Sequence, residues 1–430
     1  MLITIYVFMP YYVRFVADTP VAGQALVAQA GQVAGWAVAL TAPLVGVVAD
    51  RLGPRKPALT FAVLGMAPLY AAMWFVTRDG PISPALFLAI AAGKSILFAW
   101  SEVLHNALLL PAARGAVSRT SGLGLALGNA TSVAMLVAVL WAFALPGSVD
   151  WAFVPAEPLF GLDPAAHEPA RITGPIVAAS LLVGLVLILV GVPDVPPTGA
   201  RLGAALRAGL SDLRAMLAEL RHEREAAKFL LARMLYVDGK TAILLFGGVL
   251  AAGTMGWGTL QMLAYGILLS ILAVAGGLIG PRLDLALGPK RAVLVEIGIT
   301  ALALVALLGT QPGRLAWAPV PTAALHGGPM FATIAELGFI AIAGVTAISI
   351  TAAYASSRTL LTTLVPPERV GTFFGLYALS GTATMWLGPL LVAWGTIATG
   401  TQQGGFAMVL LLLAAGFVAL TFVRAPASSR

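Results

Sequence analysis

The sequence consists largely of long apolar segments separated by short polar ones. At about 1.5 Å per helical residue, segments of this length can cross a hydrocarbon core of roughly 30 Å. We predict twelve membrane spans, near residues 1–17, 22–49, 57–77, 84–111, 120–146, 172–192, 227–252, 258–283, 291–311, 331–363, 370–396 and 404–424. The pattern therefore predicts an all-α integral membrane protein with twelve transmembrane helices.

The longest polar connection lies between the sixth and seventh spans, at residues 193–226. It begins with Pro193, Pro196 and Pro197 and continues as a charged, amphipathic stretch. We interpret it as a cytoplasmic linker with an amphipathic helix, which joins an N-terminal six-helix bundle (1–192) to a C-terminal six-helix bundle (227–430). A helix that lies on the inner membrane surface is equally compatible with this stretch.

The composition agrees with a membrane protein and excludes several other classes. Of the 430 residues, 59% are hydrophobic and 10% are charged, and the mean hydropathy is +0.94. We therefore expect one membrane body instead of the two or three soluble domains that this length would otherwise suggest. The sequence has no cysteine, which excludes disulfides and thiolate metal sites, and its four histidines argue against a histidine metal site. No motif resembles a nucleotide-binding loop or a hydrolase site, so we predict no cofactor, no metal and no enzymatic activity.

The basic residues predict the orientation in the membrane. Most of them fall on one side of the predicted spans, whereas most loop acids fall on the other. Because Lys and Arg favour the cytoplasmic side, we predict that both termini and the linker are cytoplasmic. The net charge of +7 then reflects topology, and we expect no nucleic-acid partner. The basic side carries Arg51, Arg55, Lys56, Arg114, Arg119, the linker, Lys290, Arg291, Arg369 and Arg424.

A short polar motif follows the second span and returns in altered form after the eighth. Each copy has a Gly, an Asp four residues later, and a Gly-Pro pair followed by two basic residues. Such a repeat indicates two homologous halves, which in membrane proteins is typical of transporters. The copies comprise Gly46, Asp50, Arg51, Gly53, Arg55 and Lys56, and Gly280, Asp284, Gly288, Lys290 and Arg291.

The paired loops resemble the signature loops of the major facilitator superfamily. Further motifs resemble its autophagy-related vacuolar-effluxer branch, whose bacterial members are mostly of unknown substrate. The resemblance implies the major facilitator fold, with two pseudo-symmetric six-helix bundles. The motifs are Leu231–Gly239 in span seven, His105–Pro111 at the end of span four, Ser357-Arg358 in span ten, and Leu364–Arg369 and Phe373–Gly381 around span eleven.

The resemblance also implies that the paired loops latch the cytoplasmic side shut between spans two and eleven. The matched positions of Asp50 and Asp284 favour this latch over a simple topological anchor, because an anchor needs only basic residues. A carboxylate in such a loop can accept hydrogen bonds from the N-terminus of a neighbouring helix. We expect Arg358, near the cytoplasmic end of span ten, and Arg233, at the matching depth in span seven, to join this inner gate.

Charged residues inside spans are costly and point to function. Asp238 in span seven and Lys94 in span four both lie near mid-membrane. The resemblance places spans one, four, seven and ten around a central cavity, so we expect the two side chains to face each other and to support proton exchange. A static salt bridge between them is the alternative. Lys240 projects from nearly the opposite helix face, and it can pair with Asp238 only if Gly239 breaks the helix.

Other polar residues of the spans are secondary candidates. In span four, Glu102 and His105 are spaced so that they can pair, and Asn106 is placed to orient Glu102. Tyr236 and Tyr354, in spans seven and ten, are candidates for the lining of the cavity. We interpret Glu296 in span nine as structural, because Lys290 and Arg291 are close to it in the sequence.

Together these features predict a secondary active transporter that exports a small solute by rocker-switch alternating access, coupled to protons. One acid and one or two cations suit a neutral or zwitterionic solute, and the resemblance implies an amino-acid-like compound or another small metabolite. We expect a monomer in a bacterial inner membrane, with the solute, protons and membrane lipids as partners. Two alternatives stay open: a hydrophobic drug or lipid exporter or flippase, and a non-transporting receptor on the same fold.

Overall fold

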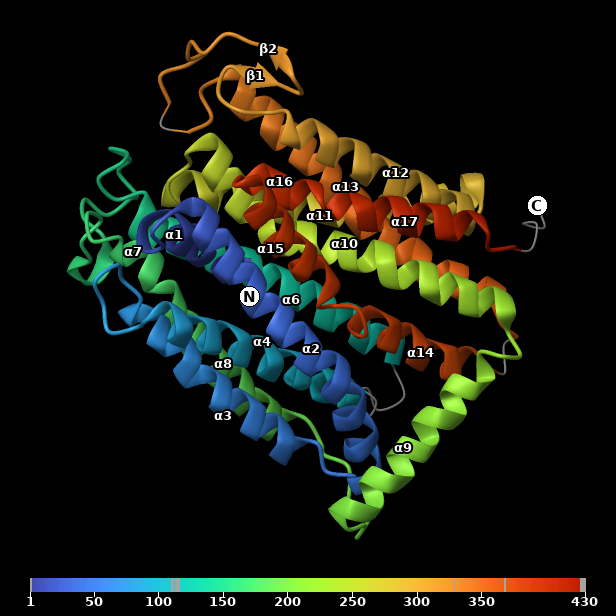
Figure 1. Cartoon of the computed structure of the whole chain (residues 1–430). Helices are drawn as coiled ribbons and strands as arrows, with labels where there is room; N and C mark the ends of the chain where they lie inside the picture. The colour runs from blue at the N-terminus through green and yellow to red at the C-terminus, as the bar shows by residue number, and fades with distance from the viewer. Residues whose placement is uncertain (1, 110–111, 113–116, 329, 367–368, 426–430) are drawn as a thin grey trace.

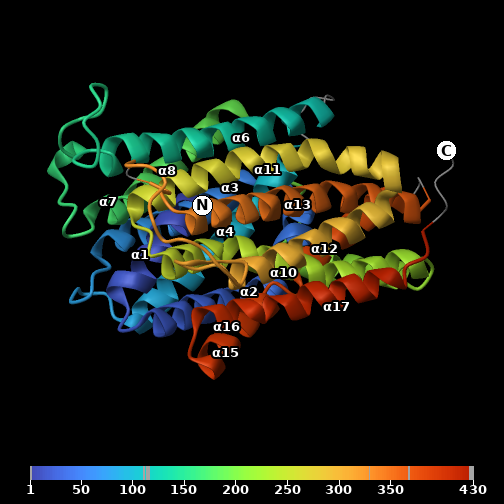
Figure 2. The same cartoon turned by 90° about the horizontal axis from the view of Figure 1, so that it is seen from above.

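The computed structural model describes residues 2–109, 112, 117–328, 330–366 and 369–425. Pro111 and Arg114, which belong to the motifs and the basic side discussed above, lie outside the described residues. The helices run side by side along one direction (Figures 1 and 2). This arrangement agrees with the all-α membrane architecture that the apolar segments predict.

The first half of the chain forms the lower left part of Figure 1. Its first span consists of short α-helical and π-helical turns, and its later spans are regular helices. The elements are η1 (Thr4–Phe8), α1 (Met9–Tyr11), η2 (Tyr12–Val16), α2 (Pro20–Leu52), α3 (Lys56–Ala72), η3 (Met73–Phe75), α4 (Pro84–Ala107), α6 (Val117–Val139), η4 (Leu140–Ala144), η5 (Leu159–Gly161), α7 (Glu168–Arg171) and α8 (Thr173–Gly191).

The second half forms the upper right part of Figure 1, and the linker helix α9 crosses below it. The elements are α9 (Leu202–Glu219), α10 (Arg224–Met255), α11 (Thr259–Leu287), α12 (Pro289–Leu308), β1 (Arg314–Leu315), β2 (Ala318–Pro319), α13 (Ile334–Leu364), α14 (Val370–Thr382), α15 (Leu387–Thr399), α16 (Gln402–Ala407) and α17 (Val409–Thr421). Strands β1 and β2 pair as a small antiparallel hairpin, which the sequence pattern did not predict.

In the described part of the chain, ten helices are long and apolar enough to cross a membrane. The remaining two predicted spans correspond to η1–α1–η2, which is short, and to α6 with η4, where the apolar helical stretch is Ala130–Ala144. The predicted span eleven is interrupted between α14 and α15, and the predicted span twelve between α16 and α17. The ten helices confirm ten of the predicted spans, whereas the interruptions inside spans eleven and twelve were not predicted.

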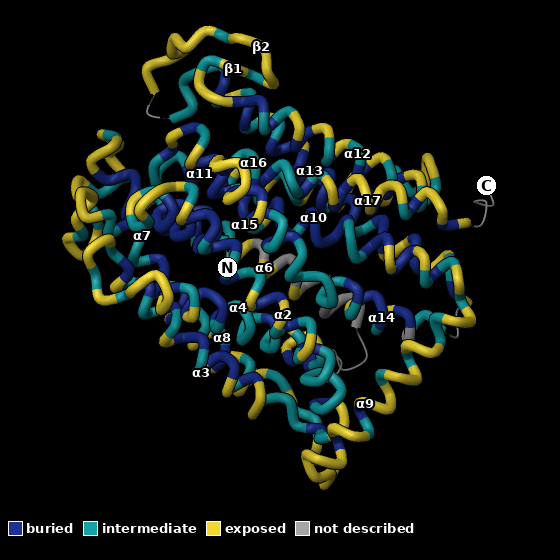
Figure 3. Tube along the Cα trace, viewed as in Figure 1, coloured by how far each residue is buried: buried dark blue, intermediate teal, exposed yellow. Residues whose placement is uncertain are grey.

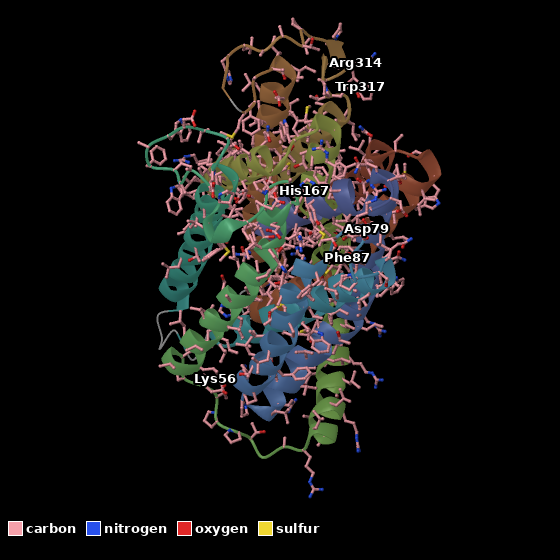
Figure 4. The ribbon with its side chains drawn as sticks, turned by 90° about the vertical axis from the view of Figure 1, so that its left-hand side faces the viewer. Lys56, Asp79, Phe87, His167, Arg314 and Trp317 are labelled. Atoms are coloured by element: carbon pink, nitrogen blue, oxygen red, sulfur yellow. The ribbon has the colours of Figure 1, made fainter. Side chains whose placement is uncertain are left out.

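Two ends of the molecule are used as reference points below. The linker end carries α9 and the loop between α2 and α3, and the hairpin end carries β1 and β2 (Figure 1). Figure 4 shows Lys56 near the linker end and Arg314 and Trp317 at the hairpin end. Buried residues occupy the interior of both helix groups, whereas α9 is largely exposed (Figure 3).

The two halves pack against each other most closely along α2 and α15. A Cβ atom on Gly35 would lie 2.5 Å from the backbone of Trp386, so only glycine permits this approach. The Trp36 ring stacks on the Trp386 ring, with centroids 4.1 Å apart. Closer to the hairpin end, the Gln24 amide donates to Thr396 Oγ1 at 2.8 Å, and Arg14 Nη1 donates to the Trp257 carbonyl at 2.7 Å. These contacts join the halves from the middle of α2 to the hairpin end, and α14 also packs on α2.

Candidate functional site

A large cavity lies between the two halves, with a volume of about 1260 Å³. Its walls come from the first span and from α6, α10, α11 and α13. The polar groups on its walls are uncharged: among its described lining residues there is no Asp, Glu, Lys, Arg or His. The lining residues that carry hydroxyl groups are Tyr6, Tyr265, Ser270, Thr346, Thr351 and Tyr354.

Several residues of α6 and α11 that line the cavity are exposed. On α11, Ile271, Val274 and Leu278 line the cavity at helical spacing and are 55%, 56% and 62% exposed. On α6, Ala134 and Val137 line it from the other side and are also exposed. Figure 2 places α6 at the margin of the helix bundle beside α11. The part of the cavity wall that α6 and α11 form is therefore apolar and accessible.

Asp238 does not line the cavity, and its side chain binds the start of α15 instead. It lies on α10 and is 3% exposed, and its Oδ2 accepts a hydrogen bond from the Gly388 backbone N–H at 2.7 Å. Gly388 is in the first turn of α15, where N–H groups lack partners within the helix. The other carboxylate oxygen, Oδ1, is buried and has no hydrogen-bond partner among the described residues.

Lys94, the predicted partner of Asp238, points elsewhere. It is buried on α4, and its Nζ lies 5.3 Å from the centroid of the Tyr70 ring on α3. Among the described residues, Lys94 and Asp238 form no ion pair, and neither lines the cavity. The expectation that these two charges face each other across the cavity is therefore not met in this structure. Each instead lies inside its own half of the molecule.

Lys240 is fully buried in the second half. Helix α10 continues unbroken through Gly239, so Lys240 points away from Asp238, as its spacing predicts. Its Nζ lies 4.0 Å from the centroid of the Tyr354 ring and 5.5 Å from that of Tyr236. The Tyr236 hydroxyl is 2.8 Å from Ser357 Oγ. Of these residues, only Tyr354 reaches the cavity.

Glu296 corrects one interpretation of the sequence. It is 1% exposed on α12, and its Oε1 accepts a hydrogen bond from Ser356 Oγ on α13 at 3.0 Å. Lys290, the expected partner, donates instead to the Thr421 carbonyl at 2.9 Å. Lys290 is six residues from Glu296, about 240° around the helix, so it projects from a different face. Glu296 thus belongs to the buried interior, which that angular separation could have indicated.

The polar residues at the linker end of α4 are accessible. Glu102, His105 and Asn106 are all exposed, and Glu102 interacts electrostatically with His105. Among these described side chains, no hydrogen bond joins Asn106 to Glu102. The structure therefore gives no contact through which Asn106 would orient Glu102.

The loop after α2 is held by the linker. Asp194 accepts hydrogen bonds from the backbone N–H groups of Arg55 at 2.9 Å and Lys56 at 3.1 Å, and so caps the start of α3. Partial burial acts to raise the pKa of Asp194, but these bonds and that from Val195 lower it below its usual value. Asp50 pairs within its own loop, with Arg55 at 2.7 Å. Gly53 adopts a φ of +97°, a conformation that glycine permits in this turn.

Helix α9 forms ion pairs with both halves. Asp212 pairs with Arg51 of the first half at 2.5 Å. Arg369 of the second half pairs with Glu219 at 3.2 Å and with Glu223, just after the helix, at 3.3 Å. Among the described residues, the ion pairs between the α2 loop and the start of span eleven run through the linker, and α2 also packs on α14.

The remaining candidates of the inner gate lie in different environments. Arg233 is buried and joins α10 to α14, donating to the Tyr377 carbonyl and to Ser380 Oγ, both at 2.6 Å. Arg358 is exposed. In the second motif, Gly288 has a φ of +82°, and Asp284 Oδ1 has no hydrogen-bond partner among the described residues. The two repeated loops thus share a glycine turn but differ in what their aspartates contact.

Two groups of membrane helices around a central cavity are also found in solved structures of membrane transporters. A nucleoside transporter, NupG, has a similar structure, with a TM-score of 0.67 and 14% identity over 98% of this chain and 94% of that one. A bacterial homologue of the human lysosomal transporter Spinster, in an inward-facing and unoccupied conformation, matches with a TM-score of 0.58 and 17% identity over 99% and 98% of the two chains. At these identities the likeness concerns the fold alone.

The particular family follows from the sequence. The model of the family described as vacuole effluxer Atg22 like matches residues 114–430, and the chain belongs to this family. No curated protein matches the sequence significantly. The chain is accordingly a multi-pass membrane transporter and not an enzyme.

Proposed function

We propose that this protein is a secondary active transporter of an apolar or amphipathic small molecule, which it carries through the cavity by alternating access. The observation that supports this substrate class is the lining of the cavity, which is apolar apart from hydroxyl groups and backbone. A zwitterionic amino acid would have to leave water without a charged partner there, which is costly. The geometry therefore favours the hydrophobic drug or lipid alternative over the amino-acid-like solute.

The size and the open side of the cavity support the same substrate class. Its volume of about 1260 Å³ exceeds the roughly 300–1,000 Å³ of common small-molecule sites. The exposed stripe of Ile271, Val274 and Leu278 offers a route from the membrane for a compound that dissolves in lipid. The hydroxyl groups of Tyr6, Tyr265 and Tyr354 can orient a polar end of such a compound.

We place the linker end in the cytoplasm, because the basic residues of both motifs and of α9 are concentrated there. The halves are in contact on the hairpin side through Arg14 and Gln24, and at the linker end the ion pairs between them run through α9. We therefore interpret the structure as the state that faces the cytoplasm. Export in exchange for protons fits this orientation, and Asp238, with one unbonded carboxylate oxygen, remains a candidate proton carrier.

The proposal is tested by binding of N-phenylnaphthylamine, a neutral hydrophobic fluorophore, to the purified protein, with zwitterionic amino acids as competitors. Ala134→Trp fills the cavity from α6, and Ala138→Trp places the same ring on an exposed position of α6 that does not line the cavity. We expect loss of binding in the first variant only, and no competition by amino acids. Equal binding in both variants, or displacement by an amino acid, would contradict the proposed substrate class.

Transport is tested separately, in proteoliposomes with an imposed pH gradient. Uptake or release of the fluorophore should depend on the gradient and should be lost in Ala134→Trp. Binding without any transport would instead support a receptor on the same fold.

A further inference from the structure

Two buried ionisable side chains in the second half have no part in the cavity lining. Lys240 on α10 is 0% exposed and Glu296 on α12 is 1% exposed. Charged groups at such depth are costly unless they are paired, and they are retained mainly where they serve function. The residues come from different helices, so chain connectivity alone does not bring them together.

Neither group is fully satisfied. Lys240 Nζ has no hydrogen-bond partner among the described residues, and Glu296 Oε2 has none either, although Oε1 accepts from Ser356. The ammonium and the carboxylate interact electrostatically but lie too far apart for a direct ion pair. A structural salt bridge would show the opposite geometry, with short bonds that use the lone pairs and protons of both groups. The unbonded Glu296 Oε2 is a position at which a proton can bind.

Few other charges surround this pair. Arg233, on α10, interacts with Lys240, and Asp284, at the end of α11, interacts with Glu296. Asp238 lies on α10 but points toward α15, where it binds Gly388. Helix α17 packs on both α10 and α12 and has no charged residue. Besides burial and the hydrogen bond from Ser356, Lys240 is the cation that interacts with Glu296.

Tyr354 connects this pair to the cavity. One face of its ring covers Lys240 Nζ at 4.0 Å, a distance at which a cation is attracted to the ring. The same side chain lines the cavity, and its hydroxyl is 3.4 Å from Thr241 Oγ1. A molecule that displaces the Tyr354 ring would remove this contact from Lys240. The loss would make the charged form of Lys240 less favourable, and it would therefore alter how readily Glu296 holds a proton.

We propose that Lys240 and Glu296 form a buried proton-binding site, distinct from Asp238, whose protonation is coupled to occupancy of the cavity through Tyr354. Glu296 takes up the proton at its unbonded carboxylate oxygen, and Lys240 supplies the positive charge that favours its release. The coupling rests on the proposed transport cavity, whereas the proton site itself does not.

The proton site is tested by infrared difference spectroscopy of the ligand-free protein during a pH titration. A protonated carboxylic acid in a dry environment gives a carbonyl band that a carboxylate lacks. We expect such a band to titrate in the native chain, to be lost in Glu296→Gln, and to be kept in Glu336→Gln, which alters a carboxylate at the hairpin end. Lys240→Met removes the neighbouring cation and should shift the midpoint of the band toward alkaline pH.

A titrating band that survives in Glu296→Gln and is lost in Asp238→Asn would overturn the proposal, as would an identical midpoint in Lys240→Met. The coupling has its own measurement: addition of N-phenylnaphthylamine should change the band in the native chain and in Tyr354→Phe, which keeps the ring, but not in Tyr354→Leu. An equal change in all three would refute the role of Tyr354. Failure of the fluorophore to bind would count against the proposed cavity, and the ligand-free titration would still decide the proton site.

Discussion

The hydrogen bond between Asp238 and Gly388 gives a direct test of how the second half is held together. The bond joins the middle of α10 to the start of α15, two residues after Trp386, whose ring stacks on Trp36 of the first half. Asp238→Ala removes the acceptor, whereas Asp238→Asn keeps an amide oxygen at nearly the same position. The two variants therefore separate the hydrogen bond from the charge.

The geometry sets the expected magnitude. A bond of 2.7 Å to a buried carboxylate belongs to the charge-assisted class, which contributes about 1.5–3 kcal/mol. Hydrogen bonds between membrane helices average about 0.6 kcal/mol and reach about 1.7 kcal/mol, so the lower part of the first range applies. We expect Asp238→Ala to lower the free energy of unfolding by about 2 kcal/mol, roughly a 30-fold change in the equilibrium constant. Asp238→Asn, which retains a neutral bond, should cost about 1 kcal/mol or less.

The assay is unfolding by sodium dodecyl sulfate in mixed micelles, followed by loss of helical circular dichroism. Asp79→Ala is the control, because Asp79 is exposed and its side chain forms no hydrogen bond or ion pair among the described residues; we expect a change of less than about 0.5 kcal/mol. Equal losses in Asp238→Ala and Asp238→Asn would show that the charge matters and the bond does not. No loss in either variant would refute the argument that Asp238 stabilises the start of α15.

Two further predictions concern the linker and the packing of α11 on α13. Because the pKa of Asp194 is lowered in the folded state, its carboxylate stabilises the fold above the usual Asp range near pH 4, and this contribution is lost as the pH falls through the lowered pKa. Unfolding measured against pH should therefore show a smaller acid-induced loss in Asp194→Asn than in the native chain, and identical profiles would contradict the capping role. A Cβ on Gly276 would lie 2.3 Å from the Ile348 carbonyl oxygen, so Gly276→Ala should cost about 1–3 kcal/mol from overpacking, partly offset by about 1 kcal/mol of helix propensity. Gly277→Ala, whose Cβ meets nothing within 4 Å, should be neutral or stabilising in the same assay, and equal effects of the two would contradict the packing argument.

The sequence predicted the helical membrane architecture because apolar segments of sufficient length leave few alternatives in a membrane. It did not predict the interruption of span eleven between Thr382 and Leu387, since both sides of the break are apolar. The Gly388-Pro389 pair was the available signal, because proline is favoured in the first turn of a helix. The partner of Asp238 could not be deduced from the sequence either, because it is a backbone N–H group, which every residue except proline has.

The candidate site was predicted less completely than the fold, because the sequence does not show how each helix is rotated about its own axis. A helix that is apolar on most sides gives little indication of which face meets the cavity. The side chains of Lys94 and Asp238 turn toward Tyr70 and Gly388. Both Tyr354 and Tyr236 were candidates for the cavity lining. Tyr354 lines the cavity, whereas Tyr236 is fully buried and does not. Sequence gives depth along a span directly, and the facing direction only where polar residues share a stripe.

Helix α10 brings the proposed elements of the mechanism together. Ile243 and Gly247 line the cavity on its surface, Asp238 binds the start of α15, and Lys240 interacts electrostatically with Glu296. A rotation or shift of this single rigid helix therefore changes the cavity wall, the contact between the halves through α15, and the surroundings of the proton site at once. Because interfaces of packed helices adopt discrete arrangements, these three changes are expected to occur together. Such a common element is what coupling between substrate and proton requires, since both must bias the same two-state equilibrium.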